Sequence, residues 1–407
     1  MALEAAATEI LQSGPLDAAA ATRRRGLLFL AAAVACAQIT MAIQMGLNAN
    51  FLRDDLGISG LQFGLLEATR ETCGILAFAI LAVLAGIAEP FIGLAMLLLL
   101  ATGIGLYSIA ANYTWVLLLS LVWSQGLHVW MPLPSSMTLA MAEPGRAGHR
   151  LGQIQAAGAA GYGGGLLIAL CLTLSHLPIR PIYLVAGTTA VAAALACLGI
   201  PRRIKTPGPR LVFRRRYGLY YAISLLEGWR KQISISFSVW LLVEQFRTPV
   251  TIILSLMIAV QVIGYFASPR VGRLIDRVGE RKVLLFYYAT LVGLFVGYGL
   301  IRNPYILYAI FILDGSLFVC VLALTSYVNR IAPKSEHTIT LSMGVAMNHI
   351  AAVAMPLTGG LLWKFGYYWA FLIGAAVAGV SLLVSLNVPR HNPAAAAAVA
   401  LPAGEEA

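Results

Sequence analysis

The chain has 407 residues, of which 59% are hydrophobic and only 11% are charged. Soluble globular proteins usually have about 25% charged residues, so this composition excludes a soluble domain and fits a polytopic membrane protein. The net charge of +11 comes from short basic clusters between apolar runs, which is typical of cytoplasmic loops. We therefore expect the lipid bilayer, and no nucleic acid, as a partner.

Polar and proline-bearing breaks divide the chain into apolar segments of about 20 residues, the length that crosses a bilayer as a helix. There are twelve, at residues 26–48, 61–86, 91–111, 115–141, 151–174, 181–199, 219–243, 250–269, 283–302, 305–328, 338–362 and 367–388. The sequence thus predicts an all-α polytopic membrane protein with twelve transmembrane helices. Residues 1–22 and 391–407, rich in alanine, are expected to be disordered tails.

The distribution of basic residues predicts the orientation of these helices. With the N-terminus inside, twenty of the 28 basic residues fall on the cytoplasmic side, five on the opposite side and three within the membrane. Cytoplasmic loops carry the excess of lysine and arginine in membrane proteins. Both termini are therefore expected in the cytoplasm, with the protein in the cytoplasmic (inner) membrane.

The longest loop, residues 201–218, predicts a linker between two six-helix halves, residues 23–200 and 219–390. It contains seven basic residues and two prolines within its interior. Gly164-Gly165-Leu166-Leu167 in the fifth segment is repeated as Gly359-Gly360-Leu361-Leu362 in the eleventh. Two related halves with a binding site between them are a recurring plan of transporters.

The seventh segment, residues 219–243, carries three ionisable groups near its middle. Glu227, Arg230 and Lys231 are three and four residues apart, which places them on one face of a helix. Each such group costs about 2.5–3.5 kcal/mol at the bilayer centre unless it faces protein or water. This face should line a polar cavity, where Arg230 and Lys231 could bind a polar or anionic solute.

Other polar residues also lie near the middle of apolar segments. In the second segment, Glu67, Arg70 and Glu71 repeat the three- and four-residue spacing. Further members of the set are Gln38, Gln44, Asn48, His128, Gln261, Asp314, Asn348 and His349. A carboxylate in a cavity that alternates between wet and dry can exchange a proton, which makes Glu227 and Asp314 candidates for proton coupling.

The loop between the eighth and ninth segments carries a recognisable motif. It reads Gly272-Arg273-Leu274-Ile275-Asp276-Arg277-Val278-Gly279-Glu280-Arg281-Lys282. With twelve segments and a basic central loop, this stretch resembles the second-half copy of the G-x-x-x-D-R-x-G-R-[RK] signature of the major facilitator superfamily. The resemblance covers residues 23–390; Glu280 departs from it, and the first-half loop at residues 85–91 lacks the Asp-Arg core.

The resemblance implies a secondary transporter that works by alternating access between two helical bundles. In the family these loops hold the cytoplasmic side closed, and here Arg150 would be a partner of Asp276. The gating residues that it implies are Gly272, Asp276, Arg277, Gly279, Arg281 and Arg150.

The resemblance also assigns roles to the segments. Segments 1, 4, 7 and 10 would line the cavity, 2, 5, 8 and 11 would form the moving interface, and 3, 6, 9 and 12 would face lipid. The implied substrate-binding residues are Arg230, Lys231, Gln44, Asn48, His128, Gln261 and Trp229. The implied proton-coupling residues are Glu227, Asp314, Glu67, Arg70 and Glu71.

Several alternatives remain open at this point. Glu227 could pair permanently with Arg230 or Lys231 and only rigidify its helix. The protein could export drugs or toxic amphipathic compounds, or it could be a transporter-like receptor or assembly factor without flux. An enzyme is not expected, since no nucleophile–base set or phosphate loop occurs, and five cysteines without a CxxC pair predict no metal site. We expect a monomer with a small-molecule substrate and no cofactor, driven by the proton gradient.

Overall fold

The computed structural model describes residues 15–143, 145–205, 212–333 and 336–390. The predicted tail 391–407, the first fourteen residues of the predicted tail 1–22 and linker residues 206–211 lie outside the described residues. Within the described ranges every regular element is a helix, as the sequence predicted, and the first helix already begins at Pro15.

Ten helices in the described part of the chain are long and apolar enough to cross a membrane. They are Ala20–Asp55, Glu89–Ile109, Tyr113–Met141, Ala147–Leu174, Ile179–Gly199, Val250–Val278, Glu280–Leu300, Pro304–Ile331, Ile339–Trp363 and Tyr368–Ser385. The other two predicted segments, 61–86 and 219–243, are also helical and carry the two groups of intramembrane charges. The all-α polytopic architecture is confirmed, while the count of twelve spanning helices stays a prediction.

The helices cluster into two compact units. The first contains the described residues of Met1–Pro209 together with Arg247–Ile258, and the second those of Arg210–Phe246 and Ala259–Ala407. The first residues after Arg247 pack in the first unit because the Thr248 carbonyl accepts a hydrogen bond from Asn50 at 3.0 Å. The Leu254 side chain also fills the space beside Gly46.

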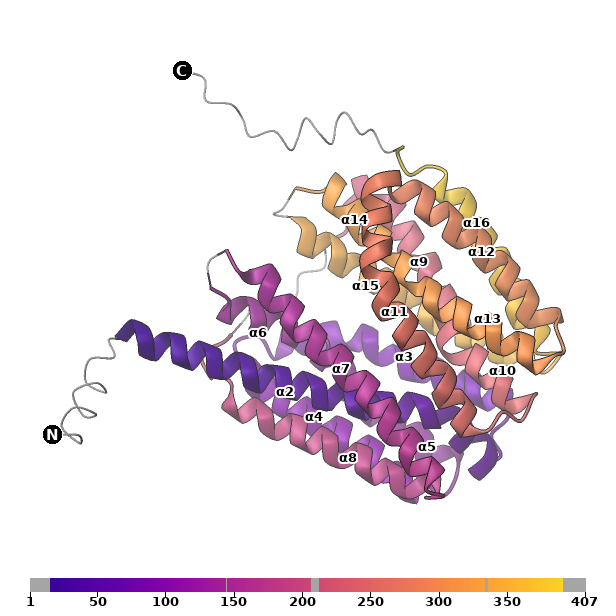
Figure 1. Cartoon of the computed structure of the whole chain (residues 1–407), viewed down its shortest axis with the longest axis horizontal. Helices are drawn as coiled ribbons and strands as arrows, with labels where there is room; N and C mark the ends of the chain where they lie inside the picture. Colours follow the sequence, from indigo (N-terminus) through magenta and orange to yellow (C-terminus); the bar gives the residue numbers. More distant parts are fainter. Residues whose placement is uncertain (1–14, 144, 206–211, 334–335, 391–407) are drawn as a thin grey trace. The chain divides into compact units, whose positions relative to one another are not determined.

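The first unit is built from helices that span residues 15 to 199. They are α2 (Pro15–Asn50), η1 (Phe51–Asp55), α3 (Gly60–Val83), α4 (Glu89–Gly105), η2 (Leu106–Ile109), α5 (Tyr113–Trp130), α6 (Leu133–Met141), α7 (Ala147–Leu174), α8 (Ile179–Ala196) and η3 (Cys197–Gly199). Helix α2 packs against α7 and α8, α4 against α5 and α8, and α3 against α5 (Figure 1).

The second unit contains the remaining helices. They are η4 (Arg215–Tyr217), α9 (Gly218–Gln232), η5 (Ile233–Phe237), α10 (Ser238–Glu244), most of α11 (Val250–Val278), α12 (Glu280–Leu300), α13 (Pro304–Leu317), η6 (Phe318–Val321), α14 (Leu322–Ile331), α15 (His337–Trp363) and α16 (Tyr368–Ser385). Helix α12 packs against α16, and α9 packs against α15 and α16. The π-helical turn η5 interrupts the seventh predicted segment, and such turns are frequent at functional sites.

Polar caps explain where three of the helices begin. Ser59 and Gln62 form a reciprocal capping box at the start of α3. Asn112 accepts a hydrogen bond from the Trp115 amide and starts α5, and Asn303 accepts from two amides at the start of α13. These caps satisfy backbone amides that have no partner within the helix.

Glycines allow α7 to approach α2 closely. A Cβ atom on Gly161 would lie 2.3 Å from the Ala35 carbonyl oxygen, and one on Gly165 would lie 2.6 Å from the carbonyl oxygen of Ile39. Gly163, by contrast, has open space around its missing side chain. The glycine-rich fifth segment therefore presents one small-residue face to α2, as expected where helices meet in a membrane.

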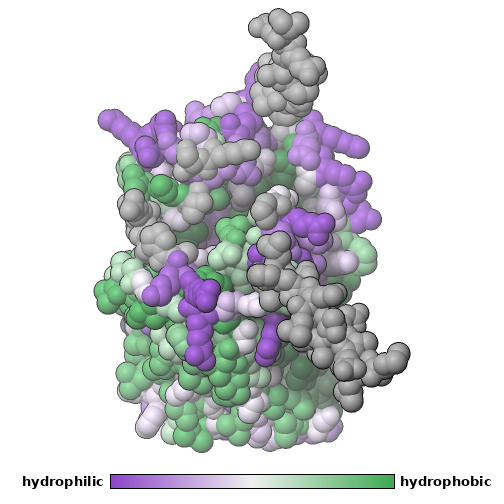
Figure 2. Space-filling view, turned by 90° about the vertical axis from the view of Figure 1, so that its left-hand side faces the viewer, coloured by the Kyte–Doolittle hydropathy of each residue, from purple (hydrophilic) through white to green (hydrophobic). Residues whose placement is uncertain are grey.

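Large apolar side chains cover much of the surface of each unit. Val83 is 83% exposed, Tyr265 76% and Phe286 61%. Figure 2 shows broad hydrophobic areas and separate clusters of hydrophilic side chains on the face that it draws. Soluble monomers rarely expose apolar patches of this kind, so these surfaces are the ones that contact lipid.

Candidate functional site

Glu227 on α9 is the centre of a buried polar network in the second unit. Its Oε1 atom accepts hydrogen bonds from Arg230 Nε at 2.8 Å and from the Tyr287 hydroxyl at 3.1 Å. Its Oε2 atom accepts a third from the Tyr288 hydroxyl at 3.2 Å. Three donors thus satisfy this carboxylate, which is the condition under which a charge is tolerated in a protein interior.

Arg230 also faces a second carboxylate, that of Asp314 on α13. Its Nη1 atom donates to the Ser234 hydroxyl at 3.1 Å and lies 3.8 Å from Asp314 Oδ1. The Ser234 hydroxyl in turn donates to the same Asp314 oxygen at 2.8 Å. Asp314 is therefore linked to the guanidinium mainly through a hydroxyl group.

The position of Ser234 depends on the π-helical turn η5. Ser238 donates its hydroxyl to the Ser234 carbonyl at 2.6 Å, so that a side chain caps a backbone acceptor in this irregular turn. The turn therefore holds Ser234 between Arg230 and Asp314.

Aromatic rings enclose the Arg230 guanidinium. Its Cζ atom lies 4.9 Å from the Phe318 ring centroid and 5.5 Å from that of Tyr287, distances at which cation–π attraction is effective. The Arg230 side chain is 1% exposed. Its Nη2 atom has no hydrogen-bond partner among the described residues, so one donor of the guanidinium fork is left over.

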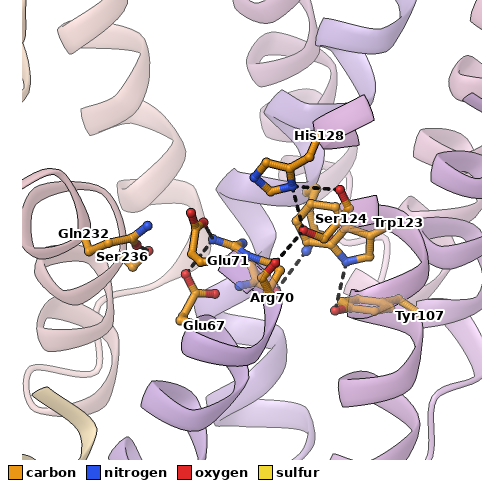
Figure 3. Close-up of polar contacts among 11 residues, drawn as sticks. Glu67, Arg70, Glu71, Tyr107, Trp123, Ser124, His128, Gln232 and Ser236 are labelled. Atoms are coloured by element: carbon orange, nitrogen blue, oxygen red, sulfur yellow. Dashed lines mark hydrogen bonds and ion pairs between the residues drawn. The ribbon is translucent and has the colours of Figure 1, made fainter. Parts of the chain in front are cut away.

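A second buried network lies in the first unit, between α3, α5 and η2 (Figure 3). Arg70 Nη2 donates to Glu67 at 2.8 Å and to Glu71 at 3.2 Å. The guanidinium lies over the Trp123 ring, 5.2 Å from its centroid, and Trp123 donates to the Tyr107 hydroxyl at 3.2 Å. This arginine, like Arg230, is shared by two buried carboxylates.

His128 joins this network through a serine. The Ser124 hydroxyl donates to the Arg70 backbone carbonyl at 3.0 Å and lies 3.1 Å from His128 Nδ1. His128 Nδ1 is also 2.8 Å from the Ser124 carbonyl, so the tautomer with hydrogen on Nδ1 suits this position. The histidine thus extends the polar cluster along α5, as Figure 3 shows.

Five further residues proposed as substrate-binding lie outside these two networks. Gln44 Nε2 donates to Asn48 Oδ1 at 3.1 Å along α2, while the buried Gln44 Oε1 has no hydrogen-bond partner among the described residues. Trp229, Lys231 and Gln261 are half-buried and make no hydrogen bond or ion pair within the described ranges. Their predicted roles therefore stay predictions.

Comparison with known proteins agrees with this architecture. The model of the Major Facilitator Superfamily matches residues 219–404, the second predicted half. This second half of the chain belongs to the major facilitator superfamily. The match covers the Glu227 network and the motif loop, and family and fold together indicate a transporter rather than an enzyme.

Solved structures with the same fold align with nearly the whole of this chain. A mutant of the nucleoside transporter NupG aligns with a TM-score of 0.74 at 13% identity, over 89% of this chain and 99% of that chain. A bacterial homologue of the human lysosomal transporter Spinster aligns with 0.71 at 13%, over 90% and 98%. A D-xylose-proton symporter aligns with 0.68 at 12%, over 91% and 98%. At these identities the likeness shows the fold alone, and no curated protein sequence matches.

The motif loop of the transporter connects α11 to α12. Gly279 has a φ of +84°, a conformation that favours glycine, and it directly precedes α12. Gly272 has open space around it, and Asp276 and Arg277 are exposed. Arg281 is half-buried, so the structure gives a local reason for Gly279 and leaves the gating roles of the other residues as predictions.

Arg150, the proposed partner of Asp276, has a partner within its own unit. Its Nε and Nη2 atoms donate to the two oxygens of Glu143 at 2.9 and 2.6 Å, a bidentate pair. The hydrogen bonds from Arg150 lower the pKa of the Glu143 carboxyl to about 2. This pair ties the loop after α6 to the first turn of α7.

The sequence interpretation treated Glu280 only as a departure from the motif and did not connect it with Glu89, at the equivalent place of the first half. Glu89 begins α4 and accepts a hydrogen bond from Ser136 at 2.7 Å. Glu280 begins α12, accepts from Ser326 at 3.0 Å and pairs with Arg330 at 3.2 Å. The signal available was the recurrence of an acid at the start of the third helix of each half, where the helix dipole favours it. The motif's departure at Glu280 thus has a structural partner.

Proposed function

We propose that the protein is a secondary active transporter that moves a small polar solute across the cytoplasmic membrane by alternating access, with Asp314 as a proton-coupling group. The observation that carries this proposal is the sharing of Arg230 between Glu227 and Asp314. The proposal includes a monomer with both termini in the cytoplasm, as the loop charges favour.

Charge balance supports Asp314 as the group that exchanges the proton. The network holds two buried carboxylates against one guanidinium, and an uncompensated charge in a protein interior is strongly destabilising. Glu227 has three donors, whereas Asp314 is 3.8 Å from Arg230 and is bridged to it by Ser234. A proton on Asp314 would bring the net charge of the network to zero and free the Ser234 hydroxyl from its hydrogen bond to this carboxylate.

The charge balance of this network, two carboxylates against one guanidinium, also favours a neutral polar solute over a strongly anionic one. The sequence alone left both open, because Arg230 could have been free to bind an anion. Two carboxylates and two aromatic rings already surround it, and only Nη2 lacks a partner among the described residues. A solute hydroxyl or carbonyl can accept from that atom without displacing a carboxylate. The fold is shared with proteins named as a nucleoside transporter and a D-xylose-proton symporter, which supports this class.

The test begins with a search for the solute. Purified protein is screened by thermal shift against nucleosides, pentoses, hexoses and carboxylates, since a ligand that binds only the folded state raises the melting temperature. Uptake of each hit is then measured in proteoliposomes with and without an inward proton gradient. The proposal requires gradient-driven uptake that Asp314→Asn abolishes while gradient-independent exchange of the solute persists.

Three results would overturn this proposal. Uptake that depends equally on the gradient in wild type and Asp314→Asn would remove Asp314 as the coupling group. Selective binding of amphipathic drugs would favour efflux, and a stable protein partner without any flux would favour a receptor.

A further inference from the structure

The second unit contains an apolar crevice that plays no part in the proposed transport site. It has a volume of about 370 Å³ and lies between α11, α12, α13 and the following turn η6. Its walls are apolar except for Lys282 and Ser316. No member of the Glu227–Arg230–Asp314 network lines it, so the crevice is a separate feature of the unit.

The packing of α13 against α11 explains why the crevice exists. The two helices approach closely at Gly315, where a Cβ atom would lie 2.8 Å from Val260. On α11 the crevice is lined by residues farther along the helix, such as Val271, and on α13 by residues on both sides of the contact, such as Leu313 and Leu317. The helices therefore leave a gap beyond this contact, toward Lys282.

The crevice opens to the apolar surface of the protein. Phe286 is 61% exposed, and Leu274 and Leu313 are each 46% exposed. On a chain that spans a membrane, exposed apolar side chains of this size face acyl chains rather than water. The natural occupant of an open apolar gap in this position is a lipid tail.

The charge at one end of the crevice selects among lipids. Lys282 is exposed and lines the crevice, while Arg273 and Arg277 are exposed on the preceding helix. Glu280 is already paired with Arg330, which leaves Asp276 as an exposed acid in the motif loop. The loop is therefore basic, and the loop charges of the whole chain favour the cytoplasmic leaflet for it.

We propose that this crevice binds one acyl chain of an anionic phospholipid of the cytoplasmic leaflet, with the phosphate group held by Lys282. Basic pockets between membrane helices on this side bind anionic headgroups, and each basic residue near an anionic surface contributes about 1 kcal/mol. The bound lipid fills the gap between α11 and α13. It makes this surface a specific lipid site, distinct from the solute pathway.

Native mass spectrometry of the full-length protein in detergent tests the headgroup part of the proposal. The probes are phosphatidylglycerol and phosphatidylcholine with identical acyl chains. Wild type should bind phosphatidylglycerol several-fold more tightly, and Lys282→Ala should weaken that binding about fivefold, the equivalent of about 1 kcal/mol. Lys364→Ala, which removes an exposed lysine elsewhere on the chain, should leave the preference unchanged.

Filling the crevice tests the acyl-chain part. Val271→Phe and Ala267→Leu each place extra side-chain volume in the gap and should reduce binding of both lipids. A variant counts only if its melting temperature matches wild type, and two fillers keep the test open if one fails to fold. Equal binding of the two lipids by wild type, or an unchanged preference in Lys282→Ala, overturns the proposal. If both of these larger side chains leave lipid binding as tight as in wild type, surface charges alone hold the lipid. That result overturns the proposal as well.

Discussion

Glu227 and Asp314 face the same guanidinium but are held in different ways. Glu227 accepts three hydrogen bonds, from Arg230 and from two tyrosine hydroxyls of α12. Asp314 accepts from the Ser234 hydroxyl and lies 3.8 Å from Arg230. We propose that the two carboxylates divide two roles: Glu227 holds the arginine in place, and Asp314 binds and releases the proton.

This division predicts opposite behaviour for two isosteric variants. Glu227→Gln should lower the free energy of unfolding by a few kcal/mol, because breaking a buried ion pair by removing one partner typically costs about 3–5 kcal/mol. Asp314→Asn should change stability by about 1 kcal/mol or less and should remove the response of uptake to a proton gradient. Unfolding in detergent and uptake in proteoliposomes measure the two effects. A destabilised Asp314→Asn together with a stable, uncoupled Glu227→Gln would reverse the assignment.

Arg70 should not tolerate replacement by lysine. Its guanidinium donates to Glu67 and Glu71 and lies over the Trp123 ring, and a lysine ammonium cannot reproduce this planar geometry. Arg70→Lys should therefore lower the free energy of unfolding by about 2 kcal/mol, within the range typical of broken buried networks. The matched control is Arg203→Lys at an exposed position, which should be neutral. Equal stability of the two variants would mean that Arg70 does not organise the cluster.

The sequence carried enough information for the helices and for the charged clusters. Apolar length predicts spanning helices directly, and the three- and four-residue spacing of Glu227, Arg230 and Lys231 predicts a shared face. The structure agrees for Glu227 and Arg230, which form an ion pair. Lys231 makes no ion pair among the described residues, because neighbouring helices decide which side chains on a face find partners.

The partners supplied by distant helices were not predictable. The ninth segment was expected to face lipid, yet its Tyr287 and Tyr288 hydroxyls donate to Glu227. An uncharged tyrosine in an apolar run gives no sign of which side it faces. The bridge from Ser234 to Asp314 likewise depends on the π-helical turn η5, which no hydrophobic pattern reveals.

The Glu143–Arg150 pair predicts a specific dependence of stability on pH. Because the pKa of Glu143 is about 2 in the folded protein, below the ordinary value of about 4.3, the pair stabilises the folded state above about pH 4.3. That contribution falls as the pH drops toward 2. The melting temperature of Glu143→Gln should therefore lie below that of wild type at pH 6, and the difference should shrink at pH 3. The variant Arg203→Gln, at an exposed position, serves as the control, and a difference that is the same at both pH values would exclude the ion pair as its cause.

The packing of α7 on α2 predicts opposite effects for two alanine substitutions that are two residues apart. In Gly161→Ala the new methyl group would meet the Ala35 backbone at 2.3 Å, a contact that backbone atoms cannot relieve by rotating a side chain. Overpacking of this kind typically costs about 1–3 kcal/mol, and here it should separate the two helices. Gly163→Ala meets no atom within 4 Å, and alanine is a better helix former than glycine by about 1 kcal/mol. Unfolding in detergent should therefore give a lower melting temperature for Gly161→Ala and an equal or higher one for Gly163→Ala. A similar decrease in melting temperature in both variants would show that the glycines of this helix provide flexibility rather than contact with α2.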